Sequence, residues 1–417
     1  MIQKQISDFK KQALQYASTF DVCCYLDSNS YIDKYGKHDC LIAFGVEKEL
    51  TAPVGNSFSR LKTFVKENPT WMFGLITYDL KNEVEALEQT YLDDLNFPEL
   101  YFFIPKYLIS IKSNEIEIIK GNREIIDGIE KTLLFDDETA QIINIQSKFT
   151  KAAYLETLER IKQHIKRGDV YEMNFCQEFF AENANINPLS TYNKLSAISP
   201  SPFSGFLKIK DKYILSATPE RFLAKKGNIL TSQPIKGTAK RSTNETEDLS
   251  IKDDLKNSKK EQAENVMIVD LVRNDLTKSA VKGTVKVDEL FGIYTFPQVH
   301  QMISSISCEL SPDVHFIDAI RNTFPMGSMT GAPKLRAMQL IDKYERSKRG
   351  AYSGSFGYIS PDGDFDFNVV IRSILYNSSN KYLSFQVGGA ITYQSDAELE
   401  YEECLLKASA MMSVLKN

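Results

Sequence analysis

The sequence predicts an α+β protein, because strands and long helices follow one another without the regular strand–helix–strand rhythm of a parallel barrel. An apolar stripe with helical spacing lies between residues 150 and 168. Apolar and polar residues alternate strictly over 364–375, as expected of a strand with two unlike faces. The length of 417 residues provides core for about two or three domains, or for one large unit with a smaller satellite.

The N-terminal third combines short helical and strand-like runs, with apolar segments at 71–79 and 100–104. The pattern becomes more regular near residue 145, where we place the main boundary. The predicted organisation is therefore an N-terminal region, residues 1–145, followed by a larger domain, residues 146–417.

The first element after this boundary is a predicted helix. Thr150 is its expected N-cap and Gly168 its expected stop, and its buried stripe consists of Tyr154, Leu158, Ile161 and Ile165. Strands separated by Pro, Ser, Asp and Gly are expected next, at 169–180, 203–209, 213–218 and 228–235.

Two further helices follow these strands. A highly charged helical region covers about 244–275. The next helix begins near Pro333, because proline suits a first helical turn.

The C-terminal part is predicted to contain two strands and a last helix. The alternating strand 364–375 places Arg372 on its polar face. A second strand, 382–392, leads to a helix that Ser395 and Glu398 open as a capping box.

Composition excludes several classes of protein. With 50 Lys+Arg against 55 Asp+Glu, the net charge of −5 gives no reason to expect a nucleic-acid partner. No apolar run approaches the ~20 residues that span a bilayer, and the N-terminal run is too polar for a signal peptide, so we expect a cytoplasmic protein without membrane contact. The six cysteines form no CxxC pair and the four histidines no HExxH pattern, which disfavours disulfides and zinc.

Two pairs of glutamates stand out by their spacing. Glu261 and Glu264 lie three residues apart in one predicted helix, and Glu400 and Glu403 three apart in another. Each pair presents both carboxylates on one helix face. Four such carboxylates suit a hard divalent cation such as Mg²⁺. Solvated helix faces are the alternative interpretation.

A lysine lies between an apolar strand and a glycine turn, in the segment PIKGT at 234–238. To act as a nucleophile, Lys236 must be uncharged part of the time, which needs desolvation or nearby cations. Lys240 and Arg241 are expected to supply that positive field. The alternative is a surface lysine in a turn.

Glu220 and Arg372 are further candidates. Glu220 follows a strand, and burial would raise its pKa enough for a general acid, although a salt bridge to Arg221 or another cation would also explain it. The guanidinium of Arg372 is suited to bind a carboxylate through two hydrogen bonds. An ion pair with Asp364 or Asp366 is the rival interpretation.

Glycine-rich turns at 327–334 and 386–390 expose backbone N–H groups that suit anions. Neither matches a nucleotide phosphate loop. His300 lies among apolar residues, where a histidine is more often part of the core than a catalyst.

Several motifs in a fixed order resemble the chorismate-utilising enzymes, which include the first components of anthranilate and aminodeoxychorismate synthases and the isochorismate and salicylate synthases. The resemblance covers about 145–412 and matches only loosely before that. The motifs are SATPERF (216–222), PIKGT (234–238), ENVMIVDLVRNDL (264–276), FPMGSMTGAPK (324–334), RGAYSGSFGY (349–358), VVIRS (369–373) and SDAELEYEECLLKA (395–408).

The resemblance implies an anthranilate synthase component I-like fold, in which two β-sheets pack together between flanking helices, with the active site in the cleft between them. It makes residues 146–417 the catalytic, chorismate-binding domain. It also implies Mg²⁺ held by Glu264 and Glu403, with Glu261 and Glu400 in support. The ion would bind the ring carboxylate of chorismate.

The other implied roles concern the substrate. Ser328, in the turn at 327–334, is expected to contact it, and His300 is expected near its ring carboxylate as a catalytic residue. The family turn reads Gln-x-Gly-x-Gly, so Ala390 is a departure at the second glycine. The resemblance also implies that Gly237 and Thr238 contact the ring of the substrate. It implies that Tyr352, Arg372 and Gly388 hold the enolpyruvyl carboxylate.

Lys236 indicates the subfamily. Family members that form anthranilate read PIAGT, whereas PIKGT resembles aminodeoxychorismate synthases. Lys236 would add at C2 of chorismate while Glu220 protonates the departing C4 hydroxyl, and ammonia would then attack C4 and expel the lysine. Isochorismate-forming members have a lysine base where this chain has Glu172, which disfavours water as the nucleophile.

The sequence contains no GxCxG block of a glutamine amidotransferase, so a separate glutaminase subunit is expected to supply ammonia. No lyase domain is expected either, so the product would be 4-amino-4-deoxychorismate, a precursor of 4-aminobenzoate and folate. Two alternatives stay open: an anthranilate synthase component I, and a catalytically silent regulatory subunit with the same fold.

Overall fold

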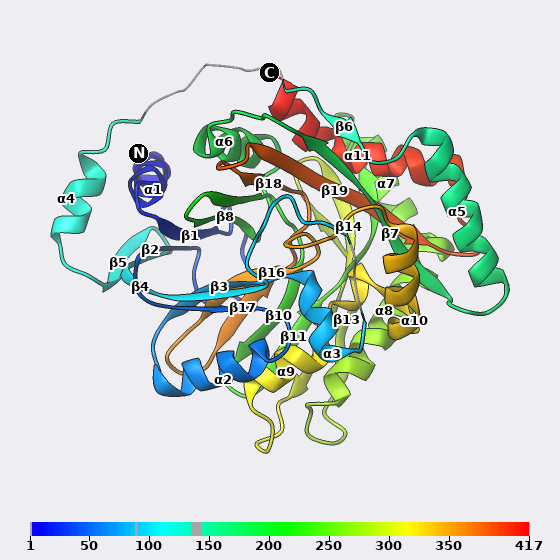
Figure 1. Ribbon diagram of the computed structural model, residues 1–417, viewed down its shortest axis with the longest axis horizontal. Helices are drawn as coiled ribbons and strands as arrows, with labels where there is room; N and C mark the ends of the chain where they lie inside the picture. The colour runs from blue at the N-terminus through cyan, green and yellow to red at the C-terminus, as the bar shows by residue number, and fades with distance from the viewer. Residues whose placement is uncertain (1, 88–90, 135–142, 417) are drawn as a thin grey trace.

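The computed structural model describes residues 2–87, 91–134 and 143–416, and in this part of the chain it confirms the α+β class (Figure 1). All strands belong to one 19-stranded sheet, in which the recorded pairings are antiparallel. The sheet has two arms, because two long neighbouring strands, β2 (Cys40–Ala52) and β4 (Leu100–Lys112), continue into both.

The first arm starts at β2 and ends at β7 (Glu172–Ala181). The short strands β6 (Gln146–Ser147) and β15 (Gly331–Ala332) pair with β7. Between β2 and β7 the order is β1 (Val22–Asp27), β8 (Ser204–Ile209), β9 (Lys212–Ser216), β18 (Ser373–Asn377) and β19 (Tyr382–Ile391).

The second arm starts at β4 and ends at β14 (Val299–Glu309), which pairs with β13 (Lys286–Thr295) on one side and with β12 (Ile235–Lys240) on the other. Between β4 and β14 the order is β3 (Met72–Ile76), β16 (Ser355–Ile359), β17 (Phe365–Asn368), β10 (Arg221–Lys226) and β11 (Ile229–Gln233). The strand β5 (Glu115–Lys120) pairs with the C-terminal half of β4.

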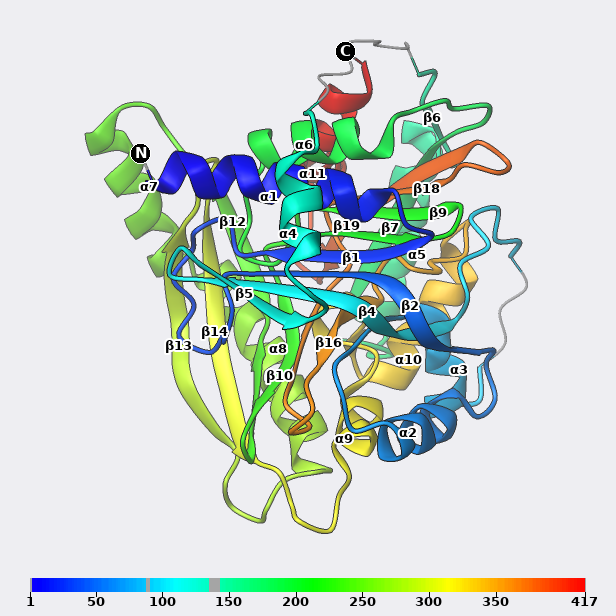
Figure 2. The same cartoon turned by 90° about the vertical axis from the view of Figure 1, so that its left-hand side faces the viewer.

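The two arms pack face to face, which confirms the prediction of two packed sheets. Figure 2 shows β1 and β2 running across the molecule while β13 and β14 run down it. The contact is close at Gly205 in β8, where a Cβ atom would lie 2.6 Å from the ring of Phe356 in β16. One hydrophobic cluster joins buried residues of both arms, such as Leu207 and Phe102.

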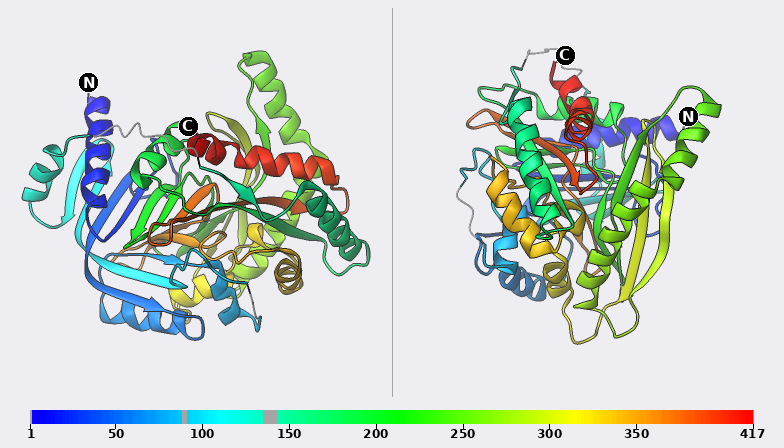
Figure 3. Two further views of the ribbon diagram at one scale, coloured as in Figure 1. Left: turned by 45° about the horizontal axis from the view of Figure 1, so that its top comes forward. Right: turned by 90° about the vertical axis from the view of Figure 1, so that its right-hand side faces the viewer.

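Helices cover the outside of the arms (Figure 3). A second hydrophobic cluster joins the first arm to α1 (Ile2–Ser18), α4 (Glu124–Glu130), α5 (Lys151–Lys166), α6 (Pro188–Ile198), α10 (Lys334–Tyr344) and α11 (Ala397–Lys416). The helices α7 (Glu245–Asn257) and α8 (Lys259–Thr277) pack against β12, β13 and β14. The helices α2 (Ser57–Glu67) and α9 (Phe316–Thr323) pack on each other, and α3 (Lys81–Val84) is a single turn.

Local signals placed the helices that the sequence predicted individually, which are α5, α7 with α8, α10 and α11. Thr150 caps α5 by accepting a hydrogen bond from the backbone N–H of Ala153, and Gly168 follows the helix with φ +84. The charged region 244–275 is two helices, because Ser258 ends α7 and caps α8.

Two local predictions were wrong. The strand 364–375 is broken: β17 ends at Asn368, β18 begins at Ser373, and Arg372 lies between them with φ +51, outside the extended conformation of a regular strand. The first turn of α11 is capped by Asp396, whose Oδ1 accepts from the N–H groups of Glu398 and Leu399. Ser395 instead accepts from the N–H of Thr392.

The division into residues 1–145 and 146–417 stays a prediction. The two ranges share one sheet, because β1 from the first range pairs directly with β8 from the second. All six cysteines are free and buried, as expected. Over the described ranges, we find no helix with the length and apolar character to cross a bilayer.

Candidate active site

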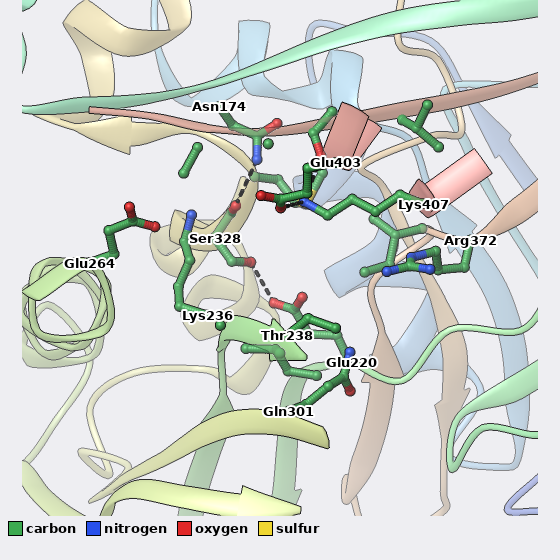
Figure 4. Close-up of a pocket in the computed structure, with 18 of the residues that line it drawn as sticks. Asn174, Glu220, Lys236, Thr238, Glu264, Gln301, Ser328, Arg372, Glu403 and Lys407 are labelled. Atoms are coloured by element: carbon green, nitrogen blue, oxygen red, sulfur yellow. Dashed lines mark hydrogen bonds and ion pairs between the residues drawn. The ribbon is translucent and has the colours of Figure 1, made fainter. Parts of the chain in front are cut away.

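One cavity lies where the two arms meet α8 and α11, and it brings together all the predicted site residues except His300 (Figure 4). Strand β12 and the residues around β10 form its floor, and β19 with the start of α11 forms the opposite wall. The predicted residues that line it are Glu220, Lys236, Gly237, Thr238, Glu261, Glu264, Ser328, Tyr352, Arg372, Gly388, Ala390, Glu400 and Glu403.

Lys236 is buried in this cavity. The register of β12 against β14 shifts between Ile235 and Thr238, so the lysine lies at a bulge, an irregularity that re-aims side chains. Gly237 there has φ +92, a conformation that favours glycine. The Nζ of Lys236 donates a hydrogen bond of 2.7 Å to Oε1 of Glu172, and the two side chains are only 9% and 1% exposed.

The expected positive field around Lys236 is wrong. Arg241 pairs with Asp248 at 2.7 Å, and neither Lys240 nor Arg241 lines the cavity. Burial alone would lower the pKa of Lys236, but the nearby carboxylates of Glu172, Glu264 and Glu220 outweigh it and raise the pKa. The amine can therefore become neutral only by giving its proton to a neighbouring base, and Glu172 is in direct contact.

Glu220 fits the predicted role of an acid. It is 4% exposed, and burial raises its pKa to about 7. The Ser328 hydroxyl donates to Oε1 of Glu220 at 2.5 Å, which opposes that rise. The rival salt bridge is absent, since the described partners of Arg221 are Asp33, Asp366 and Gln233.

The four glutamates of α8 and α11 line this cavity from two sides. Glu264 and Glu400 are buried, which contradicts the interpretation of solvated helix faces for these two, whereas the Glu403 side chain is 47% exposed. Lys260 and Lys407 lie among them. The Nζ of Lys407 is 2.6 Å from Oε1 of Glu403 and donates to the Gly388 carbonyl at 2.9 Å. Its ammonium is the main reason that the pKa of Glu403 is lowered.

A hard divalent cation fits this set of ligands. Burial is the main cause of the raised pKa values of Glu261, Glu264 and Glu400, with about 7 for Glu264, and neighbouring carboxylates add to it. The Oε1 atom of Glu264 is buried without a hydrogen-bond partner. These oxygens are donors of the kind that Mg²⁺ prefers. Within the described residues, however, no three acidic, histidine or cysteine side chains already converge on one point.

Arg372 faces the cavity without a structural ion pair. Its predicted rivals are engaged elsewhere, since Asp366 binds Arg221 and Asp364 binds Lys37 and Lys225. Burial lowers the pKa of Arg372, and among the described residues no carboxylate lies within ion-pair distance of it. An incoming anion would therefore be its natural partner.

The other predicted substrate contacts form the wall beside Arg372. The Tyr352 hydroxyl lies 3.2 Å from Sγ of Cys176, and burial raises its pKa. A Cβ atom on Gly388 would lie 2.1 Å from the carbonyl oxygen of Phe175, so only glycine fits there. Ala390 in β19 pairs with Asn174 in β7, and the φ of Ala390 is not positive, so the alanine needs no glycine-only conformation.

His300 is not placed with these residues. It is buried on the side of β14 away from the cavity, with Nε2 3.1 Å from Asp248 and Nδ1 3.0 Å from the Thr295 hydroxyl. Because side chains alternate along a strand, the next residue, Gln301, lines the cavity instead. The structure therefore corrects the expectation that His300 acts on the substrate.

Sequence reasoning missed other lining residues, above all Asn174, Lys260, Gln301 and Lys407. Asn174 donates to the Ser328 carbonyl at 3.3 Å and so ties β7 to the turn at 327–329. Lys407 had one usable signal, since it lies one helical turn beyond Glu403 on the same face of α11. Asn174 and Gln301 had none, because their partners are distant in sequence.

A guanidinium free for an anion, beside carboxylates suited to a cation, defines an enzyme that acts on a small anionic molecule. Comparison with known proteins makes the class specific: residues 22–413 match the chorismate binding enzyme family. The chain belongs to this family.

Two relatives within the family carry different names. The chain is 34% identical over 349 residues to an aminodeoxychorismate synthase component 1 of Salmonella typhimurium, covering 82% of this chain and 76% of the relative. It is 30% identical over 357 residues to an anthranilate synthase component 1 of Thermus thermophilus, covering 82% and 77%. The crystal structure of anthranilate synthase component I from Streptococcus pneumoniae superposes with a TM-score of 0.79 at 26% identity, covering 91% and 93%.

Proposed function

We propose that this chain is the chorismate-aminating component of an aminodeoxychorismate synthase. It converts chorismate and ammonia to 4-amino-4-deoxychorismate and water. The observation that carries the proposal is the position of Lys236, buried in the cavity within 2.7 Å of one carboxylate and beside a second one whose pKa is about 7. The relatives named aminodeoxychorismate synthase component 1 support it.

The first step uses Lys236 as nucleophile. Glu172 accepts a proton from the ammonium, and the neutral Nζ forms a bond to C2 of the ring. The two ring double bonds shift toward C4, the C4–O bond breaks, and Glu220 donates the proton with which the hydroxyl leaves as water. Proton transfer by positioned groups of this kind contributes roughly 10²–10⁴-fold to a rate.

The second step reverses the first with ammonia. Ammonia forms a bond to C4, the two double bonds shift back, and the C2–N bond to Lys236 breaks. A proton from the attacking nitrogen returns to the lysine, and the proton that Glu172 took in the first step replaces the one that Glu220 gave to water, so atoms and charges balance and the enzyme is restored. Two successive displacements explain why the new nitrogen occupies the position that the hydroxyl left.

The rest of the cavity orients the substrate. Arg372 and Tyr352, with the backbone at Gly388, bind the enolpyruvyl carboxylate, while Gly237, Thr238 and Ser328 contact the ring. Glu264 and Glu403, supported by Glu261 and Glu400, are suited to hold Mg²⁺, which when bound would neutralise the ring carboxylate. Ala390 replaces a glycine of the turn without loss of its N–H.

The ammonia comes from a separate subunit in this proposal, a glutamine amidotransferase. The relatives' name "component 1" supports a multi-component enzyme. We assign the reaction to the cytoplasm, since six free cysteines suit a reducing compartment.

Anthranilate synthase component I is the rival function, and relatives with that name are similarly close. Lys236 favours amination at C4, because an amine at this position would compete with ammonia for C2. The silent-subunit alternative leaves the buried Lys236 and Glu220 and the half-buried Arg372 without a purpose.

Product analysis separates these functions. Purified chain with chorismate, Mg²⁺ and ammonium should yield 4-amino-4-deoxychorismate, and Lys236→Ala should lose it. Lys240→Ala is the matched control, because Lys240 is exposed at the end of the same strand. Anthranilate as the main product of the unmodified chain would refute the proposal, and no product at all would favour the silent subunit.

A further inference from the structure

Lys260 stands between the two acidic helices. It is the second residue of α8, directly before Glu261, and its side chain lines the cavity. Its Nζ lies 3.7 Å from Oε1 of Glu400 in α11 and 4.0 Å from Oε1 of Glu264 in α8. One ammonium thus faces a carboxylate of each helix.

The contacts of Lys260 are loose. Both distances exceed hydrogen-bond length, and the Oε1 of Glu264 has no hydrogen-bond partner at all. The Lys260 side chain is 43% exposed, so it has open solvent beside it, whereas the Glu400 and Glu264 side chains are 4% and 11% exposed.

Lys407 provides the contrast within the same cavity. It is 22% exposed, lies 2.6 Å from Glu403 and also binds the Gly388 carbonyl, so two short contacts fix it. Of the two ammonium groups, only that of Lys260 is placed to leave the carboxylates without breaking a hydrogen bond.

We propose that Lys260 is a built-in counter-cation that competes with the divalent ion for Glu264 and Glu400. A divalent cation that reaches these oxygens must displace the ammonium, which moves into the solvent beside it. Lys260 therefore weakens cation binding and balances the two helices' charge when the ammonium occupies the site. This inference rests on the divalent-cation site of the proposed function.

The expected effect is electrostatic. A positive charge about 4 Å from two ligand oxygens opposes an incoming cation, and partial exposure of the side chain screens this effect. Removing the charge in Lys260→Met should tighten binding roughly tenfold. Lys260→Arg keeps the charge and should bind the ion within about twofold of the unmodified chain.

Lys259→Met is the matched control. It removes the same charge one residue earlier on α8, from an exposed side chain that does not line the cavity. The affinity of Lys259→Met for the ion should also stay within about twofold of that of the unmodified chain. Lys260→Gln repeats the charge removal with a polar side chain, in case the methionine variant fails to fold.

The measurement is a calorimetric titration of the full chain with MgCl₂ in the absence of chorismate. A second titration uses Mn²⁺, and electron paramagnetic resonance detects the Mn²⁺ that stays free. We predict that Lys260→Met and Lys260→Gln bind the ion more tightly than the unmodified chain. The affinities of Lys259→Met and Lys260→Arg should be unchanged. Equal or weaker binding by both neutral variants would overturn the proposal, as would absence of Mg²⁺ and Mn²⁺ binding in every protein. A chain that binds the ions as predicted but produces anthranilate would refute only the proposed function.

Discussion

Lys236 and Glu172 form a buried ion pair that joins the two arms of the sheet. The lysine belongs to β12 of the second arm and the glutamate to β7 of the first, and their Nζ and Oε1 atoms are 2.7 Å apart. The pair holds the amine at the cavity floor and supplies the base next to it. In our account this contact both positions the nucleophile and activates it.

Two ionisable groups of the proposed mechanism decide how the rate falls at high pH. Glu220 must hold its proton, and its pKa is about 7. Lys236 starts as the ammonium paired with Glu172, and its pKa is raised above the usual value. The alkaline limit of the reaction therefore follows Glu220, because Glu220 loses its proton at lower pH than Lys236.

Glu172→Gln should lower the rate and move the alkaline limit to higher pH. Glutamine accepts no proton, so Lys236 must lose its proton to the solvent before it reacts, and we expect a loss of roughly 10²–10⁴-fold. The reactive form of the variant then needs a neutral Lys236, so its alkaline limit follows the pKa of Lys236 instead of that of Glu220. Removal of the Glu172 carboxylate also takes away the main interaction that raises the pKa of Lys236. The test is kcat/KM for chorismate against pH at a constant concentration of free ammonia.

Glu182→Gln is the control for that profile, since Glu182 is exposed just beyond β7. An alkaline limit that is the same in Glu172→Gln and in the unmodified chain would show that Glu172 does not act on Lys236. Thermal unfolding of both variants checks that the buried lysine, left without its partner, has not unfolded the protein.

Ser328→Ala should move the alkaline limit to higher pH. The hydrogen bond from Ser328 lowers the pKa of Glu220, so without it burial raises that pKa further above about 7. The same pH series with this variant measures the shift. A limit that moves down, or not at all, would exclude Glu220 as the group that must hold the proton.

Arg372→Gln should weaken chorismate binding without destabilising the fold. The guanidinium loses no carboxylate partner in the described part of the protein, while the substrate loses a charge-assisted contact worth roughly 1.5–3 kcal/mol, or about 10–150-fold in KM. Steady-state kinetics and a melting curve test both halves. A lower melting temperature with unchanged KM would give Arg372 a structural role instead.

Chelation tests the cation site. EDTA should abolish ammonia-dependent turnover and added Mg²⁺ should restore it, because the glutamates of α8 and α11 would otherwise repel the ring carboxylate. Glu264→Gln removes the oxygen that lacks a hydrogen-bond partner, and should need a higher Mg²⁺ concentration for half-maximal rate. Full activity in EDTA would show that turnover does not need a metal ion.

The sequence predicted those parts of the fold that local interactions determine. Thr150 and the stripe from Tyr154 to Ile165 placed α5, because a cap and a period of 3.6 are properties of one segment. The strand 364–375 failed at Arg372, because alternation of residue types does not report a positive φ. The path of β2 and β4 through both arms depends on pairings between distant residues, which periodicity does not contain.

The site residues were predictable where a motif carried them, and their environment was not. The motifs placed Lys236, Glu220 and the four glutamates in one cavity. The charge around Lys236 was misjudged, because Lys240 and Arg241 are near it in sequence while Glu172 and Glu264 are near it in space. His300 was misplaced because the side of β14 that it faces depends on the packing of α7.

The most direct measurement is mass spectrometry of the chain mixed with chorismate and Mg²⁺ in the absence of ammonia. The account predicts a covalent adduct on Lys236 with the mass of chorismate minus one water, which ammonium converts to 4-amino-4-deoxychorismate. Lys236→Ala should carry no adduct, and Lys240→Ala should carry it as the unmodified chain does. Formation of 4-amino-4-deoxychorismate by Lys236→Ala at the unmodified rate would contradict the account.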